Sequence, residues 1–338
     1  MAKILVTGGL GYIGSHTVVE LAKSGYDVSI IDDLSNSEIS VLEALKEIVS
    51  EELECNILDL KNKSEIANLF EGSRFDAAIH FAASKSVGES VQDPLKYYEN
   101  NILGMVNLLM AMKQNGVDSL VFSSSCTVYG NPDELPVTEK SPLKPPASPY
   151  GNTKKICEEI IMDATKSNGS LKAISLRYFN PIGAHSSALI GERYIGIPNN
   201  LLPYLLEVAS GKREILKVFG GDYNTHDGTP IRDYIHVVDL AQAHVLAVDR
   251  LLNQPVDSSQ FEVFNLGSGN GFSVLDIVKS FEKVNNIKIK YEIVDRRPGD
   301  VEKIYADNKL SMEILGWEPT LQVDEMMTSA WNWEKRNK

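Results

Sequence analysis

Short apolar runs alternate with helix-like stretches through the first half of the chain. Runs rich in Val, Ile, Leu, Ala and Phe predict buried strands at 3–7, 27–31, 76–81 and 119–122. Apolar residues at helical spacing between these runs predict helices at 15–23, 94–115 and 148–166. Alternating strands and helices favour an α/β fold, in which helices cover both faces of a parallel sheet.

The pattern loosens after Arg177. Glycine and proline interrupt 183–203, and 220–230 is a long polar loop. Helical spacing returns at 238–252, 274–284 and 324–336. We therefore expect a sheet domain over 1–180 and a mainly smaller region over 181–338, with the chain returning to the first domain around 236–265. In open α/β sheets ligands bind at the carboxyl edge, so the smaller region is expected to pack over that edge.

Composition narrows the class of protein. The chain has 338 residues, 43% of them apolar and 23% charged, and no apolar run reaches the ~18 residues of a membrane span. Met1–Thr7 meets Gly8 too early to hold the apolar core of a signal peptide. Three cysteines, an odd number, favour free thiols in a reducing compartment, so a cytoplasmic location is expected. The net charge of −13 argues against nucleic-acid and acidic-membrane partners.

A glycine-rich turn follows the first predicted strand. Gly9, Gly11 and Gly14 fit the spacing G-x-G-x-x-G, Gly8 adds another glycine, and a predicted helix begins at once. In this context the glycines let a dinucleotide pyrophosphate approach the backbone and the helix N-terminus. The motif therefore predicts a Rossmann-type, doubly wound sheet. The alternative is a tight turn that binds no ligand.

Asp32 ends the second predicted strand, 18 residues beyond Gly14. A carboxylate at this place accepts hydrogen bonds from a ribose 2′-hydroxyl and repels a 2′-phosphate, so it favours NAD over NADP. The alternative is an exposed aspartate in a turn.

A second motif combines Ser124-Ser125 at a strand end with Tyr150 and Lys154. On a helix the last two are i and i+4 and share a face. An ammonium group and a cationic nicotinamide near the phenol should lower the pKa of Tyr150, so that the phenolate acts as a general base. Ser125 would hold the substrate oxygen or relay its proton. Taken alone, the Tyr–Lys pair also fits an ordinary surface helix.

Together these residues resemble the extended short-chain dehydrogenase/reductase superfamily and, within it, the UDP-glucose 4-epimerases. The similarity covers almost the whole chain, in VTGGLGYIGSHT (6–17), HFAASKSVGESVQDPLKYYENN (80–101), FSSSCTVYG (122–130), SPYGNTK (148–154), LRYFNPIGAH (176–185), GIPNNLLPY (196–204), DYNTHDGTPIRDYIHVVDLA (222–241) and RRPGD (296–300).

The resemblance implies reversible, NAD-dependent epimerisation of UDP-glucose and UDP-galactose at C4, through a transient 4-keto sugar. Related dehydratases carry acidic residues after the serine or threonine at the strand end, where this chain has Cys126 and Thr127. The alternatives are an enzyme acting on another UDP-sugar, such as a UDP-glucuronate epimerase or decarboxylase, and a non-catalytic NAD sensor. No further basic cluster suits a carboxylate substrate, and NAD sensors typically lose the tyrosine or the lysine.

The resemblance also implies a set of site residues. The catalytic residues would be Tyr150, Lys154 and Ser125. The cofactor would also contact Gly8, Gly11, Tyr12, Ile13, Gly14, Asp32, Asp33, Leu34, Ser35, Asn36, Ser37, Asp59, Leu60, Phe81, Ala82, Ala83, Ser84, Lys85, Asn100 and Phe179. The substrate would contact Ser125, Tyr150, Asn180, Asn200, Phe219, Arg232, Arg297, Asp300 and Ile304.

Some of these residues have plainer alternatives. Arg232 and Arg297 suit a diphosphate clamp, but they also suit surface ion pairs with Asp233 or Asp300. Family resemblance makes Ile304 a guard of the sugar pocket, and its bulk is expected to disfavour N-acetylated sugars.

The remaining expectations concern metals, a thiol and assembly. The histidines lack the spacing of metal ligands, so no metal is expected. Cys126 is expected to be a buried thiol rather than a nucleophile. Helices 94–115 and 150–166 would form a homodimer face, as is common in the superfamily, or would belong to the core.

Overall fold

A seven-stranded parallel sheet dominates the computed structural model, which describes residues 1–167, 170–194, 196, 198, 200–253, 260–297 and 300–337. The strand order is β3-β2-β1-β4-β5-β6-β10. The strands are β1 (Lys3–Thr7), β2 (Asp27–Asp32), β3 (Glu54–Ile57), β4 (Ala77–His80), β5 (Ser119–Ser125), β6 (Lys172–Tyr178) and β10 (Phe261–Leu266).

The order of the strands reverses between β1 and β4. Ile4 of β1 lies beside Val28 of β2 on one side and Ala77 of β4 on the other, in parallel register. Helices that leave β1 and β4 therefore cover opposite faces, which opens a crevice at the carboxyl ends of these strands. The Rossmann-type sheet expected from the sequence is confirmed.

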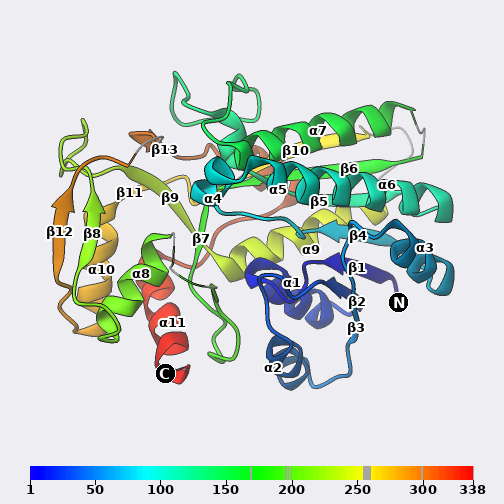
Figure 1. Ribbon diagram of the computed structural model, residues 1–338, viewed down its shortest axis with the longest axis horizontal. Coiled ribbons are helices and arrows are strands. Elements are labelled where there is room, and N and C mark those ends of the chain that lie inside the picture. Colours follow the sequence, from blue (N-terminus) through cyan, green and yellow to red (C-terminus); the bar gives the residue numbers. More distant parts are fainter. Residues whose placement is uncertain are drawn as a thin grey trace.

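Helices cover both faces of this sheet (Figure 1). One face packs against α1 (Tyr12–Lys23), α2 (Ser40–Val49) and α9 (Val237–Asn253). The other packs against α3 (Lys63–Gly72), α6 (Gly104–Asn115) and α7 (Pro149–Ser167). Short helices α4 (Val87–Gln92) and α5 (Pro94–Tyr98) lie beside α7. Buried apolar side chains of alternate strand positions fill the two layers, as the apolar runs predict.

A second group of elements lies at one end of the sheet (Figure 1). Strand β9 (Ile231–His236) pairs with β7 (Asn180–Ile182), β11 (Gly271–Ser273) and β13 (Lys303–Ile304). Strand β8 (Leu216–Phe219) pairs with β12 (Tyr291–Val294). Helices α8 (Leu201–Ala209), α10 (Val274–Asn285) and α11 (Val323–Arg336) enclose a separate apolar core with these strands.

Residues 94–115 are helical throughout, as the sequence predicts. Within this run a π-helical turn, η1 (Glu99–Leu103), separates α5 from α6. The apolar spacing predicts a helix here but does not predict the wider i→i+5 hydrogen bonding of this turn. π-turns are frequent at functional sites, and this one contains Asn100.

Strand β10 is part of the seven-stranded sheet, and helix α9 packs against that sheet. The chain reaches both elements only after β7, β8 and β9. The late helices predicted at 238–252, 274–284 and 324–336 correspond to α9, α10 and α11. In the described part of the chain, no helix combines the length and apolar character that crossing a membrane requires.

Candidate active site

The glycine turn between β1 and α1 is closed by backbone contacts. Gly8 has a φ of 71°, and a Cβ there would lie 2.7 Å from the Ala82 backbone nitrogen. A Cβ at Gly14 would clash with the Gly8 carbonyl oxygen. Gly11 is the N-cap of α1, and within the described chain no side chain caps this helix end. The turn is therefore tight and side-chain-free at these glycines, and it leads into the positive end of a helix dipole, which suits a phosphate group.

Asp32 holds the neighbouring strand end against this turn. Its buried carboxylate accepts hydrogen bonds from the Leu10 amide at 3.0 Å, from the Leu34 amide at 3.0 Å and from the Ser37 hydroxyl at 2.6 Å. It is not the exposed turn aspartate of the alternative interpretation. Asp33 binds the Ser35 amide and hydroxyl in the same loop. The carboxylate is thus fixed beside the glycine turn.

The remaining residues expected at the cofactor follow the carboxyl ends of the other strands. Those after β4 lie next to the turn, since the amides of Phe81 and Ala82 both donate to the Thr7 carbonyl. Asn100 of η1 donates to the Ser84 hydroxyl at 3.3 Å. Asp59 and Leu60 follow β3, the outermost strand, and Phe179 follows β6. Tyr12 and Ile13 are the first residues of α1, Asn36 lies in the loop after β2, and Ala83 and Lys85 lie in the segment after β4.

Ser125, Tyr150 and Lys154 meet where β5 ends and α7 begins. Ser125 is the last residue of β5, and its hydroxyl accepts from the Thr127 hydroxyl at 3.0 Å. The Ser148 hydroxyl accepts from the Gly151 amide, and Pro149 opens the helix, so α7 begins immediately before Tyr150. The ammonium of Lys154 lies 5.9 Å from the Tyr150 ring centroid and donates to the Ser123 carbonyl at 2.7 Å. The surface-pair alternative is excluded, because Lys154 is 4% exposed.

The electrostatics of this group differ from the expectation. Burial raises the pKa of Tyr150 to about 12, and the hydrogen bond with Ser125 offsets this only in part. Burial also lowers the pKa of Lys154 to about 8, against the opposing charge of Glu158. The groups of the chain itself therefore do not produce the lowering of the Tyr150 pKa that the sequence predicts for the lysine together with a cationic nicotinamide. Desolvation of the phenol outweighs the effect of a lysine that binds a carbonyl of β5.

Two clusters contain most of the residues expected to bind substrate. Arg232 lies opposite Ile304 in the β9–β13 register, and its guanidinium lies 3.4 Å from an Asp300 carboxylate oxygen. The Arg297 guanidinium lies 5.1 Å from the Phe219 ring centroid. The ion pair with Asp300 considered for Arg232 is therefore present. The pair with Asp233 is not found in the described structure, where that buried carboxylate binds the Ser268 and Ala306 amides.

Ile304 joins the substrate cluster to the end of β5. It packs in one buried apolar group with Cys126 and Phe179. Cys126 is a free, buried thiol whose pKa burial raises to about 12, so it lacks the thiolate character of a nucleophile. Asn180 lies beside Tyr234 in the β7–β9 pair.

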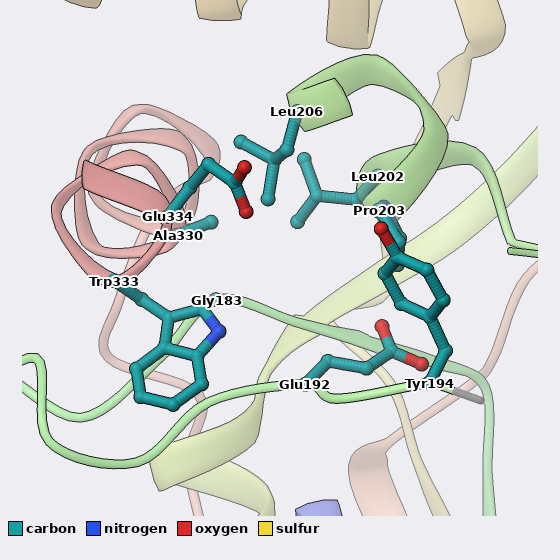
Figure 2. Close-up of a pocket in the computed structure, with 9 residues that line it drawn as sticks. All are labelled: Gly183, Glu192, Tyr194, Leu202, Pro203, Leu206, Ala330, Trp333 and Glu334. Atoms are coloured by element: carbon teal, nitrogen blue, oxygen red, sulfur yellow. The ribbon is translucent and has the colours of Figure 1, made fainter. Parts of the chain in front are cut away.

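A small pocket next to this region contains none of the predicted site residues (Figure 2). It is lined by Gly183, Glu192, Tyr194, Leu202, Pro203, Leu206, Ala330, Trp333 and Glu334. Glu192 connects it to the predicted site, because its carboxylate accepts from Asn200 at 3.0 Å and lies 3.3 Å from the Lys85 ammonium. One carboxylate thus links an expected cofactor residue to an expected substrate residue.

The described residues contain one group with metal-ligand geometry, formed by His226, Asp227 and Asp276. His226 is exposed, and Ser273 already binds both carboxylates. The four histidines considered from the sequence, His80, His185, His236 and His244, are not part of this group.

Comparison with known proteins agrees with this geometry. A family model described as GDP-mannose 4,6 dehydratase matches residues 5–330. The UDP-glucose 4-epimerase of Bacillus subtilis (strain 168) is 49% identical over 334 residues, which cover 99% of this chain and 97% of that protein. This chain belongs to the UDP-glucose 4-epimerase family.

Solved members of the UDP-glucose 4-epimerase family share the fold. The Bifidobacterium longum enzyme, crystallised with NAD+ and UDP, superposes with a TM-score of 0.95 at 43% identity, covering 99% of both chains. A UDP-Glc/GlcNAc 4-epimerase from Campylobacter jejuni gives a TM-score of 0.85 at 39% identity, over 99% of this chain and 100% of that chain.

A buried polar network that lies next to Tyr150 and Lys154 on α7 was not predicted from the sequence. Glu158 of α7 binds Ser124, Ser175 and Arg177, and Arg177 also binds Tyr129. One signal was available, since Glu158 follows Lys154 by one helical turn on the face that packs against the sheet. The other members of the network come from the strands β5 and β6 and from a short 3₁₀ turn, and no local sequence pattern connects these segments.

Proposed function

We propose that this protein catalyses the reversible, NAD-dependent C4 epimerisation of UDP-glucose and UDP-galactose. The observation that carries the proposal is the convergence of Ser125, Tyr150 and Lys154 at the carboxyl end of β5, within the sheet edge that carries the glycine turn. The names of its close relatives support the same reaction.

The residues present fit NAD. Gly8 and Gly14 let the turn, the start of α1 and the Ala82 backbone approach one another closely, and the N-terminus of α1 has no side-chain cap in the described chain. The Asp32 carboxylate beside the turn suits a ribose hydroxyl and disfavours an additional phosphate. When bound, NAD supplies a hydride acceptor and, in its oxidised form, a positive charge.

Tyr150 is proposed as the base that removes the proton from the sugar 4-hydroxyl. Burial raises the pKa of its phenol above the ordinary value of 10.0, so added positive charge in the site would favour the phenolate. Lys154 would hold charge near the ring, and Ser125 would hydrogen-bond the sugar oxygen. A base that forms only in the assembled complex would leave the free protein unreactive.

Arg232 and Arg297 are proposed to bind the diphosphate of the substrate. Guanidinium groups form bidentate, charge-assisted hydrogen bonds with phosphate oxygens, and the Arg232–Asp300 pair orients one of them. Asn180 and Asn200 are proposed to contact the nucleotide sugar, and Phe219 the uracil ring. Tight binding at the diphosphate leaves the sugar free to present either face for hydride return.

The alternatives are less well supported. A dehydratase, as in the name of the family model, needs an acid and a base where this chain has Cys126 and Thr127. A UDP-glucuronate epimerase or decarboxylase needs a further cationic pocket for its carboxylate. A non-catalytic NAD sensor does not account for Tyr150 and Lys154 in contact with one strand end.

We also infer a cytoplasmic homodimer. Three free cysteines support a reducing compartment. An apolar hollow of about 220 Å³ lies between α6 and α7, lined by Val106, Leu109, Met110, Lys113, Val117, Ile160, Ala164, Ser167 and Leu171. A second copy of this helix pair is its proposed occupant.

One experiment tests the proposed reaction. Purified protein is incubated with UDP-galactose and no added oxidant, and the mixture is analysed for UDP-glucose by chromatography. Formation of UDP-glucose until both sugars reach equilibrium is the expected result. An unchanged substrate, with protein that is folded and loaded with NAD, would refute the proposal.

A further inference from the structure

A buried ion pair lies directly behind the proposed catalytic residues. Tyr150, Lys154 and Glu158 follow one another at intervals of four on α7, so they share the helix face that meets the sheet. The side chain of Glu158 is 4% exposed and that of Arg177 is 6% exposed. Their contact joins α7 to β6, next to the strand that ends in Ser125.

The carboxylate of Glu158 accepts hydrogen bonds from two neighbouring strands. Arg177 donates through Nε at 2.9 Å and through Nη2 at 2.6 Å, and Ser175 donates at 3.0 Å, all from β6. Ser124 of β5 donates at 2.6 Å. The residue immediately before Ser125 is therefore bound to the helix that carries Tyr150 and Lys154.

The guanidinium of Arg177 binds the chain on the other side of Ser125. Its Nη1 donates to the Tyr129 hydroxyl at 3.0 Å, and that hydroxyl donates to Asn265 of β10 at 2.6 Å. Tyr129 ends the 3₁₀ turn η2 (Cys126–Tyr129), which begins directly after Ser125. Ser125 is thus flanked by two residues, Ser124 and Tyr129, that bind the same ion pair.

We propose that the Glu158–Arg177 pair is a positioning unit that fixes the Ser125 hydroxyl relative to Tyr150 and Lys154. The inference rests on the proposed function, since it assigns a purpose to the spacing of those three residues. Buried ion pairs often add little net stability compared with apolar side chains of similar volume. A role in geometry explains why hydrogen-bonded polar side chains from α7, β5, β6 and η2 occupy this part of the core.

Ser124→Ala is the informative variant. It removes one of four donors to the carboxylate and leaves the ion pair intact, so the protein is expected to fold. Displacement of a reacting group by about 1 Å can lower a rate by up to roughly 100-fold. We expect kcat for UDP-galactose to fall at least about 10-fold, with KM and bound NAD unchanged. Tyr129→Phe, on the other side of Ser125, is expected to act in the same direction.

Two matched controls separate positioning from general destabilisation. Ser175→Ala removes a donor to the same carboxylate oxygen, but from β6, which carries no reacting group. Ile161→Val trims a fully buried side chain of α7 without touching the ion pair. Both should lower the urea midpoint about as much as Ser124→Ala and change kcat less than about 2-fold. Ser124→Thr keeps the hydroxyl and should restore most of kcat.

The outcomes separate the two proposals. If wild-type protein interconverts the sugars and Ser124→Ala and Ser175→Ala have equal kcat values, the positioning role is refuted and the proposed function stands. If wild-type protein is inactive, the proposed function fails. In that case crystal structures of Ser124→Ala and Ser175→Ala test the positioning role independently of activity. If Ser125 moves relative to Tyr150 in Ser124→Ala but not in Ser175→Ala, the positioning role is supported. If Ser125 does not move in Ser124→Ala, the role is refuted.

Discussion

Ile304 allows a sharp test of substrate choice. Its side chain is 4% exposed and packs with Cys126 and Phe179, and its backbone lies opposite Arg232 in the β9–β13 register. A β-branched side chain in a two-residue strand has little freedom to move aside for an N-acetyl group. We expect clear preference for UDP-glucose and UDP-galactose over UDP-N-acetylglucosamine. A poorly accommodated substituent costs about 1–3 kcal/mol, or roughly 10- to 200-fold in kcat/KM.

Ile304→Cys should reduce this preference. The substitution replaces a four-carbon side chain with a methylene and a thiol, while the strand pairing with Arg232 stays intact. Cavity formation should cost roughly 1–3 kcal/mol, between the ranges for Ile→Val and Ile→Ala, so unfolding in urea is measured alongside the kinetics. Ile304→Val, which retains the branched shape, is the matched control and should leave the preference nearly unchanged.

The assay compares kcat/KM for UDP-galactose and UDP-N-acetylgalactosamine in the three proteins. We expect the ratio of kcat/KM for UDP-galactose to kcat/KM for UDP-N-acetylgalactosamine to fall by about 10-fold in Ile304→Cys. Equal kcat/KM values for both substrates in the wild-type protein would refute the role of Ile304. A ratio that stays constant while both values fall would show that the side chain supports the fold only. The Campylobacter jejuni relative, described as a UDP-Glc/GlcNAc 4-epimerase, makes the comparison relevant within the family.

Three further predictions follow from the site and its surroundings. Tyr150→Phe should keep the fold and bound NAD but lose at least ~100-fold in kcat, because a general base is removed; near wild-type turnover would contradict this role. Acid extraction of purified protein should release about one NAD or NADH per chain, and activity that depends on added NADP instead would contradict the role of Asp32. Met110→Glu places a charge in the hollow between α6 and α7 and should produce monomers by light scattering, whereas Lys140→Glu, at an exposed residue outside the lining of that hollow, should not; an unchanged mass would place the interface elsewhere.

Local signals in the sequence were sufficient for the Rossmann-type sheet and for the residues at its edge. The run Lys3–Thr7 followed by closely spaced glycines predicts a strand, a tight turn and a helix that together suit a phosphate group. The structure contains this strand, turn and helix. The Tyr150–Lys154 pair follows from helical spacing in the same way. Contacts that depend on tertiary packing could not be predicted from the sequence. The strand β9 binds three others from distant parts of the chain, and Glu158 is satisfied by residues of β5 and β6.

The sign of the Tyr150 pKa shift shows the same limit. A sequence places an ammonium near the phenol, but it does not reveal how much water both groups lose on folding. In the structure, desolvation raises the pKa of Tyr150 and lowers that of Lys154, so each shift favours the neutral form.

The buried lysine gives a final prediction, concerning stability and pH. Its pKa is about 8 in the folded protein and 10.5 ordinarily, so between these values the unfolded chain binds a proton that the folded protein has released. The free energy of unfolding contributed by Lys154 therefore rises with pH through this window, and below it the cost of burying the charge, roughly 3 kcal/mol, applies in full. Relative to Lys154→Met, wild-type protein should gain about 1 kcal/mol between pH 7 and 9. Tyr150 and Cys157 have raised pKa values and act in the opposite direction only above their ordinary values of 10.0 and 9.0, so measurements stop at pH 9. Urea unfolding of both proteins at pH 7, 8 and 9 provides the comparison. Parallel pH dependences would show that Lys154 does not titrate in this range, and that its charge persists beside Tyr150 at alkaline pH.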